Sequence, residues 1–205
     1  MGANPVTAYE MEPDLDYWIP VPRSFPGDGW DTAGQWAQDL AELAIPDDAD
    51  LRHVYQQLAL DVANNQVADA EHTLWYSPED GHAMGTAHLF ILDDDAGQSL
   101  ADLAMPDYES ATPVQIREYQ SNSVGQILQL TSVIAIDAPR DDDGSAILPA
   151  VGHVRTAARS RGLVFLLDAY DSELSTLSFM MDPMVDLFDT VSVYEDEPEN
   201  ETDNN

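Results

Sequence analysis

The 205-residue chain contains no cysteine and no lysine, and these absences exclude several classes of site. Without cysteine there can be no disulfide, no thiol catalysis and no cysteine-ligated zinc. Without lysine there is no phosphate-binding P-loop, and no other cofactor motif is found, so we expect no cofactor. No apolar run approaches the roughly 18 residues that span a membrane, and no signal sequence is recognised. We therefore expect a soluble, cytoplasmic protein with no membrane partner.

Positive charge is scarce, since seven arginines stand against 39 acidic residues and the formal net charge is −32. Such a surface repels nucleic acid and anionic lipid, so we expect neither as a partner. Three origins of the charge stay open: a halophilic or high-GC source, a surface that binds a basic protein partner, or mimicry of the DNA phosphate backbone. The acids are spread along the whole chain rather than in a regular stripe, which argues against mimicry.

The most informative stretch covers residues 162–194. Leu163–Leu167 is a continuous apolar run after a glycine, which predicts a strand buried on both faces. Asp182-Pro183 predicts a helix start, because Asp can cap free amides and Pro needs no donor at the first helical position. Apolar residues then recur at helical spacing: Met184, Leu187, Phe188 and Val191.

The remaining pattern predicts two early helices and then several strands. Helices are expected at 32–44, capped by Asp31, and at 49–64, with a short one at 98–105. Strands are expected at 17–22 as a proline-bounded edge, and at 70–77, 82–93, 126–138 and 149–159, while 114–121 fits helix or strand. This order predicts an α+β fold, an antiparallel meander sheet with helices packed against it. The domain is expected over 17–194, between a flexible acidic arm at 1–16 and a disordered acidic tail at 195–205.

Three segments together carry a family resemblance: the WIPVP opening, the strand GLVFLLDAYDSE and the following DPMVDLFDTVSV. In this order, around an antiparallel meander, they weakly resemble the Mog1p/PsbP-like α/β/α sandwich, over most of the chain. The resemblance implies a binding or accessory domain rather than an enzyme. It implies no particular partner and assigns no functional residue.

Histidines supply the candidates for a metal site. If Pro78–Gly81 forms a hairpin loop, Glu71 stands opposite His88 on one face of the sheet. Glu71, His82 and His88 would then offer nitrogen and oxygen ligands, fewer than the usual zinc set. A small-molecule or metal-dependent enzyme centred on the hairpin of His72, His82 and His88 is therefore one hypothesis. The alternative is ordinary cross-strand pairing of histidine with a carboxylate.

Two groups of residues are candidates for binding. Trp18 and Trp30, in an aromatic and proline-rich segment, are either packing anchors or an exposed recognition surface. Arg155, Arg159 and Arg161 cluster in the sequence, and they serve either as counter-charges or as an anion site. No G-x-S-x-G motif occurs, and the acidic runs lack the EF-hand layout. The first hypothesis is therefore a non-catalytic accessory protein that binds another protein.

Overall fold

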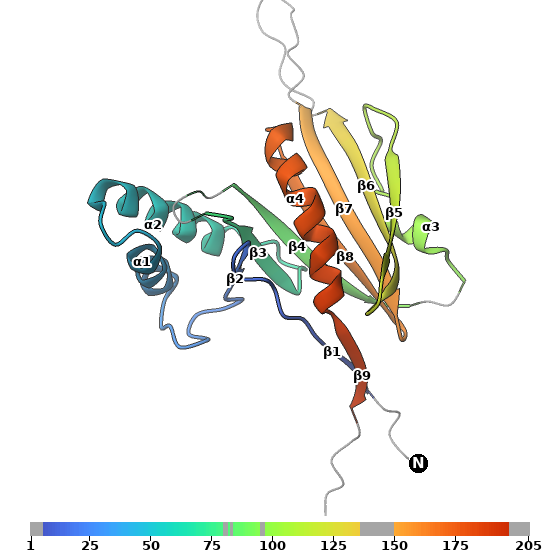
Figure 1. The fold of residues 1–205 in the computed structure, drawn as a ribbon, viewed down its shortest axis with the longest axis horizontal. Helices are drawn as coiled ribbons and strands as arrows, with labels where there is room; N and C mark the ends of the chain where they lie inside the picture. Colours follow the sequence, from blue (N-terminus) through green and yellow to red (C-terminus); the bar gives the residue numbers. More distant parts are fainter. Residues whose placement is uncertain (1–5, 80–81, 83, 95–96, 136–149, 197–205) are drawn as a thin grey trace, which may run out of the picture.

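Seven antiparallel strands form the main sheet, in the spatial order β2-β3-β4-β8-β7-β6-β5 (Figure 1). The computed structural model describes residues 6–79, 82, 84–94, 97–135 and 150–196. The strands of this sheet are β2 (Trp18–Val21), β3 (His72–Tyr76), β4 (Gly85–Asp93), β5 (Gln115–Ser121), β6 (Gly125–Ala135), β7 (Ala150–Ser160) and β8 (Leu163–Asp171). Two further strands, β1 (Val6–Glu10) and β9 (Ser192–Asp196), pair with each other in a separate antiparallel sheet.

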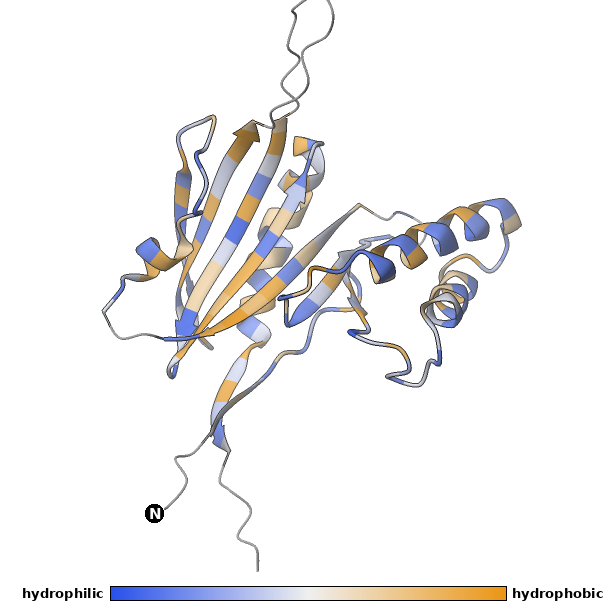
Figure 2. Cartoon of the chain, turned by 180° about the vertical axis from the view of Figure 1, so that it is seen from behind, coloured by the Kyte–Doolittle hydropathy of each residue, from blue (hydrophilic) through white to orange (hydrophobic). Residues whose placement is uncertain are grey.

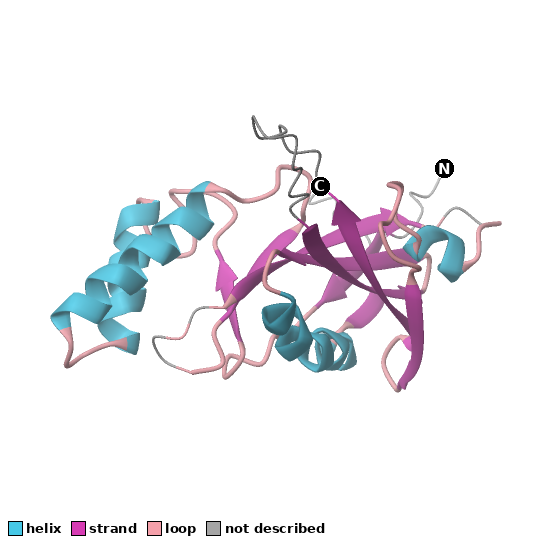
Figure 3. Ribbon diagram, turned by 90° about the horizontal axis from the view of Figure 1, so that it is seen from above, coloured by secondary structure: helices cyan, strands magenta, loops and turns pink. Residues whose placement is uncertain are grey.

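Helices lie on both faces of the main sheet, which confirms the predicted α+β class. They are α1 (Ala33–Ala44), α2 (Ala49–Asn64), α3 (Leu100–Ala104) and α4 (Leu174–Asp186), with a 3-10 turn, η1 (Leu187–Thr190), directly after α4. Helix α4 crosses one face, while the α1–α2 pair extends beyond the β2–β3 end (Figures 1 and 3). None of the helices in the described ranges is long and apolar enough to cross a membrane.

Both faces of the sheet carry a hydrophobic core, because successive side chains along each strand point to opposite faces. On β8, Phe165 and Leu167 face the core beneath α4, whereas Val164 and Leu166 face the core beneath α3. On β3, Trp75 faces α1 and α2, with its ring 4.9 Å from that of Tyr55. Between α2 and α3, the middle of this second face has no helix across it (Figure 2).

The central strand is β8, as the apolar run predicts. It lies between β4 and β7, and its residues from Leu163 to Ala169 are all buried. A tight turn at Arg161-Gly162 joins it to β7, with φ values of 46° and 86°. Positive φ at both central positions is the requirement of a two-residue type I′ hairpin, and it fixes the register of the two strands.

The helix predicted from Asp182-Pro183 begins eight residues earlier, at Leu174, and Pro183 lies inside it. An internal proline leaves the carbonyl four residues before it without its helical donor. That carbonyl belongs to Phe179, and it accepts a hydrogen bond from the Tyr76 hydroxyl at 3.1 Å. A side chain from β3 therefore supplies the donor that Pro183 removes, which allows the helix to continue.

The acidic ends of the chain also differ from the prediction. Within the arm expected to be flexible, Val6–Glu10 pairs with Ser192–Asp196. Tyr9 and Val193 pack against the main core, and the Tyr9 ring meets that of Phe165 edge-on at 5.8 Å. These apolar contacts anchor two segments whose composition is otherwise polar. Residues 1–5 and 197–205 lie outside the described part of the chain.

Other boundaries agree more closely. Helix α2 spans Ala49–Asn64 as predicted, β2 is an edge strand, and the ambiguous segment 114–121 forms β5. The cap of α1 is Thr32 rather than Asp31, because the Gln35 amide donates to the Thr32 hydroxyl at 3.1 Å.

The contact between Tyr76 and Phe179 predicts a specific stability change. Replacing Tyr76 by Phe leaves the Phe179 carbonyl without a donor, and we expect unfolding to become easier by about 1 kcal/mol. In a Pro183→Ala background, the restored amide of residue 183 can donate to the Phe179 carbonyl instead. Replacing Tyr76 by Phe should then lower the unfolding free energy by clearly less. Chemical denaturation of the four proteins measures both values. Equal costs in the two backgrounds would contradict this account of the helix.

Candidate functional site

The histidine hairpin has a different register from the predicted one. Strand β3 pairs Tyr76 with Gly85 and Thr73 with His88, so the connection is longer than Pro78–Gly81 and Glu71 is not opposite His88. His88 Nδ1 lies 3.2 Å from the Thr73 hydroxyl. The predicted pairing is therefore wrong by two residues, because the turn signal in the sequence marks only part of the loop.

The candidate metal ligands diverge as a result. His82 lies exposed in the loop, 3.6 Å from Glu79. His72 faces the opposite side of the sheet from His88, and its Nε2 lies 2.7 Å from the Tyr9 hydroxyl. Among the described residues, no three His, Asp or Glu side chains gather where they could hold a metal ion. The structure thus does not bring Glu71, His82 and His88 together.

The two tryptophans are packing residues. Trp18 is only 2% exposed and lies in the main core, with its ring 5.2 Å from that of Tyr76. Of the two alternatives for Trp18, the structure shows the packing anchor and not the exposed recognition surface, because its place on β2 turns it toward the α4 side of the sheet. Trp30 is half-buried against the α1–α2 core, and its indole donates to Asp39 at 3.0 Å.

The three clustered arginines separate in space. Arg155 forms an ion pair with Asp168, and Arg159 pairs with Asp94 at 3.0 Å. Arg161 is exposed in the β7–β8 turn. Arg155 and Arg159 therefore act as counter-charges, and the cluster does not converge on one anion site.

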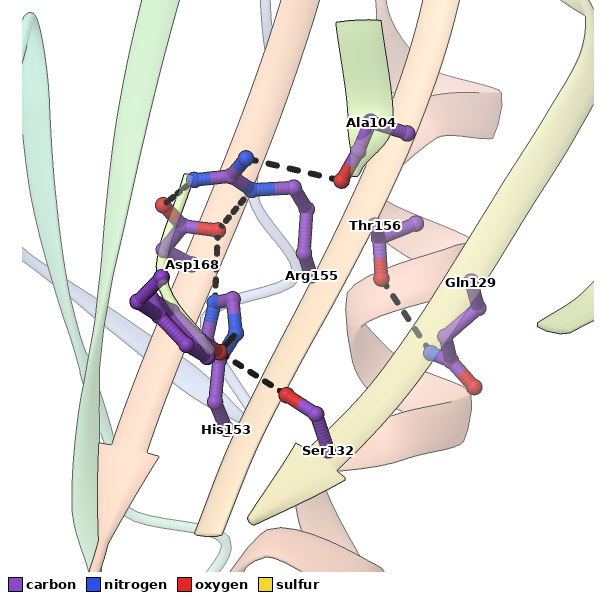
Figure 4. Close-up of polar contacts among 8 residues, drawn as sticks. Ala104, Gln129, Ser132, His153, Arg155, Thr156 and Asp168 are labelled. Atoms are coloured by element: carbon purple, nitrogen blue, oxygen red, sulfur yellow. Dashed lines mark hydrogen bonds and ion pairs between the residues drawn. The ribbon is translucent and has the colours of Figure 1, made fainter. Parts of the chain in front are cut away.

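The most polar part of the interior is centred on Asp168 of β8. Arg155 of β7 donates to both carboxylate oxygens, from Nε at 2.6 Å and from Nη2 at 2.7 Å (Figure 4). The His153 ring donates from Nε2 to the same carboxylate at 3.0 Å. Arg155 Nη1 also reaches the Ala104 carbonyl of α3 at 3.5 Å. These contacts form a buried network that joins two central strands to a helix.

The network continues across His153 to a third strand. Because the carboxylate can only accept, Nε2 of His153 carries the proton and Nδ1 accepts from the Tyr108 hydroxyl. The Tyr108 oxygen lies 2.8 Å from the Ser132 hydroxyl of β6. The Tyr170 ring stacks on His153 with centroids 4.3 Å apart. The segment after α3 is thereby fastened to the sheet through Tyr108.

The charges within the network stabilise the ionised form of the Asp168 carboxyl group. Burial alone would raise the pKa of Asp168, but the hydrogen bonds from Arg155 and His153 and the positive charge of Arg155 outweigh it, so this pKa lies below its usual value. Burial, together with the nearby charge of Asp168, raises the pKa of Tyr170 to about 12. Asp168 is therefore an anion and Tyr170 a neutral phenol at neutral pH.

An Asp–His–Tyr–Ser chain resembles a proton relay in composition, yet its position argues for a structural role. A general base must lie within hydrogen-bond reach of a substrate proton, and His153 is only 2% exposed. Both ring nitrogens of His153 already have protein partners. The network therefore supports the sheet, and candidate binding sites lie at the surface.

One surface cavity is a groove of about 590 Å³, which we call the α1–β2 groove. It lies between α1, the segment 15–20 that includes β2, and the loop at 77–79. Its lining residues are Leu15, Asp16, Tyr17, Trp18, Ile19, Pro20, Leu40, Leu43, Ala44, Tyr55, Ser77, Pro78 and Glu79. Leu15 and Leu43 are 72% and 81% exposed, which is unusual for leucine. The groove therefore presents an apolar surface to solvent.

Comparisons with known proteins place the chain in no family. No protein-family model matches the chain, and no curated protein matches it. Among solved structures the chain is similar to LpqN, described as involved in cell envelope biogenesis of Mycobacterium tuberculosis, with a TM-score of 0.38 and 12% identity over 94% of this chain and 86% of that chain. A TM-score below 0.5 does not establish a shared fold. The resemblance to the Mog1p/PsbP-like sandwich stays a prediction.

The Asp168 network predicts that a single replacement destabilises the protein more than a double replacement. Replacing Arg155 by Leu leaves a buried carboxylate without its cation, and we expect a loss of about 3–5 kcal/mol in unfolding free energy. Replacing Arg155 and Asp168 together by Leu removes both charges and should recover most of that loss. Urea denaturation of the three proteins measures this. A double variant no more stable than Arg155→Leu would show that the pair is not the main contact.

The same pair predicts a dependence on pH. Because the folded-state pKa of Asp168 is depressed, its stabilisation is fully present above the unfolded-state pKa of about 3.9. It is lost as the pH falls through the lower folded-state value. The stability difference between the natural protein and Asp168→Asn should therefore shrink below pH about 4 and stay constant above it. A difference that does not change with acidification would contradict the charged role of Asp168.

Proposed function

We propose that this protein is a non-catalytic binding protein that holds a basic, amphipathic segment of a partner protein in the α1–β2 groove. The observation that carries the proposal is the meeting of exposed apolar side chains, carboxylates and an edge strand in one groove. Each of these features favours a different property of the occupant.

The apolar side chains favour an occupant with apolar residues. Leu15 lies on the segment before β2 and Leu43 on α1, and both line the groove. Tyr17 is also exposed and lines the same groove. Covering a leucine side chain from water stabilises a complex by about 1.5 kcal/mol or more. An occupant that contacts both leucines would therefore bind mainly through these two walls.

The charges favour a basic occupant. Asp16 and Glu79 line the groove, and none of its lining residues is a lysine, arginine or histidine. The chain as a whole has a net charge of −32. A field of this sign accelerates the association of cations and repels acidic competitors. A segment that alternates basic and apolar residues would pair with these carboxylates and also cover the exposed leucines.

The edge strand favours an extended occupant. Strand β2 is the last strand of the sheet on this side, with β3 as its neighbour. An edge strand leaves backbone groups on one side available, and extended peptides add to such edges in several recognition domains. Pro20 has no backbone donor, and the Trp18 amide already donates to the Asp14 carbonyl at 2.8 Å, so the outer side of β2 offers mainly carbonyl acceptors. A partner segment beside β2 would therefore donate from its own amides to these carbonyls and contact the leucines from there.

The proposal is consistent with what the Mog1p/PsbP-like resemblance implies, namely an accessory domain and no catalytic role. Helices on both faces of an antiparallel sheet support that resemblance. We further propose that the protein works in the cytoplasm, as its composition predicts. The buried position of His153 supports a binding role over a hydrolytic one.

A peptide-binding experiment tests the groove. The full chain is titrated into a fluorescently labelled decapeptide of alternating Lys and Leu, and binding is followed by anisotropy. We expect a Leu15→Ser, Leu43→Ser double variant to weaken binding about tenfold or more, because it removes both apolar walls. A Lys–Ser decapeptide should bind more weakly and lose its binding as salt is raised.

A matched control comes from the opposite edge of the sheet. Ile116 of β5 is also an exposed apolar residue, and Ile116→Ser should leave the affinity for the Lys–Leu peptide unchanged. The proposal fails if the double leucine variant binds as tightly as the natural protein. It also fails if the Lys–Ser peptide binds as well as the Lys–Leu peptide, since charge alone would then explain the interaction.

A further inference from the structure

A second cavity lies on the α4 face of the sheet, at the end away from the α1–β2 groove. This cavity, which we call the α4–β5 cleft, has a volume of about 350 Å³ and lies between α4 and the edge strand β5, over β6 and β7. Its volume is at the lower end of the roughly 300–1,000 Å³ typical of small-molecule sites. Apolar walls come from Val154 of β7 and from Leu177 and Met181 of α4.

One residue of the cleft carries a positive charge. Arg117 of β5 lines it, and no ion pair or hydrogen bond joins Arg117 to a described residue. Most arginines in the described part of the chain already have polar partners: Arg23, Arg52, Arg155 and Arg159. Arg161 also lacks such a partner, but it lies in an exposed turn. Arg117 is thus an arginine that both lines a cavity and has its donors available.

The composition of the cleft is unusual for this chain. Acids number 39 among 205 residues, yet no Asp or Glu is among the residues that line the cleft. The other polar residues of the lining include Thr131 and Ser178, which carry hydroxyls, and His153, whose ring nitrogens contact Asp168 and Tyr108. An anion that enters the cleft therefore meets a cation and hydroxyl donors without a repelling carboxylate in the lining.

We infer that the α4–β5 cleft binds a small amphipathic carboxylate. The carboxylate pairs with the Arg117 guanidinium, whose planar fork matches two carboxylate oxygens. The apolar body of the ligand packs against Val154, Leu177 and Met181. Neighbouring Gln129 takes no direct part, because its amide already donates to Thr156 and to the Met181 carbonyl and its remaining oxygen is shielded from solvent. Recognition of the charged end thus depends on Arg117.

The inference is tested with octanoate as the probe and octanol as its uncharged match, titrated calorimetrically into the full chain. We expect octanoate to bind the natural protein and Arg117→Gln to weaken it about tenfold or more, since a charge-assisted pair is lost. Arg161→Gln, which removes an exposed arginine outside the cleft, should leave the affinity unchanged. Ser178→Trp, which fills the cleft from α4, should also weaken binding while leaving Arg117 in place.

Three results would overturn the inference. The first is no binding of octanoate to the natural protein at millimolar concentration. The second is equal affinity for octanoate and octanol, which would show that the cleft does not recognise the charge. The third is an equal loss in Arg117→Gln and Arg161→Gln, which would show that only the overall charge matters. Circular dichroism of each variant establishes that it is folded before it is titrated.

Discussion

The ion pair between Arg155 and Asp168 is the constraint on which the rest of the fold depends. A carboxylate in the middle of an otherwise apolar central strand is costly to bury unless a cation and hydrogen bonds satisfy it. Arg155 can satisfy it only if β7 lies beside β8 in the observed register. The same guanidinium contacts α3, and His153 extends the network to the segment that follows α3. One buried charge therefore selects both a strand pairing and the position of a helix.

Part of this arrangement could be read from the sequence. The apolar run Leu163–Leu167 predicted the central strand, and Arg161-Gly162, directly before this run, has the residue pattern of a tight turn from the strand expected at 149–159. Counting residue pairs outward from that turn places Arg155 opposite Asp168, so the ion pair itself could have been found from the sequence. The contribution of Tyr108 could not, because a loop residue far along the chain carries no local signal of its partner.

Two of the wrong predictions share a physical cause. Asp182-Pro183 has the local pattern of a helix start, but the hydroxyl of Tyr76 satisfies the carbonyl that Pro183 leaves free, and the helix continues. Tyr9 likewise anchors an acidic segment to the core, although composition alone predicts a flexible arm. In the histidine hairpin, the turn residues gave a register that was wrong by two. In the first two cases, a contact between distant segments outweighed the local preference, whereas in the hairpin the turn residues mark only part of the loop. The α1–β2 groove combines such segments too, so the sequence identified its aromatic segment without its leucine walls.

The distribution of charge also bears on the origin of the acidity. A halophilic or high-GC source would explain why acids are abundant and lysine is absent, since such a background acts on the surface as a whole. It does not explain why the charged residues that line the two cavities have opposite sign. Carboxylates and no cation line the α1–β2 groove, whereas an arginine and no carboxylate line the α4–β5 cleft. Two cavities of opposite character on one strongly acidic surface are what separate binding sites for a basic and an acidic ligand require.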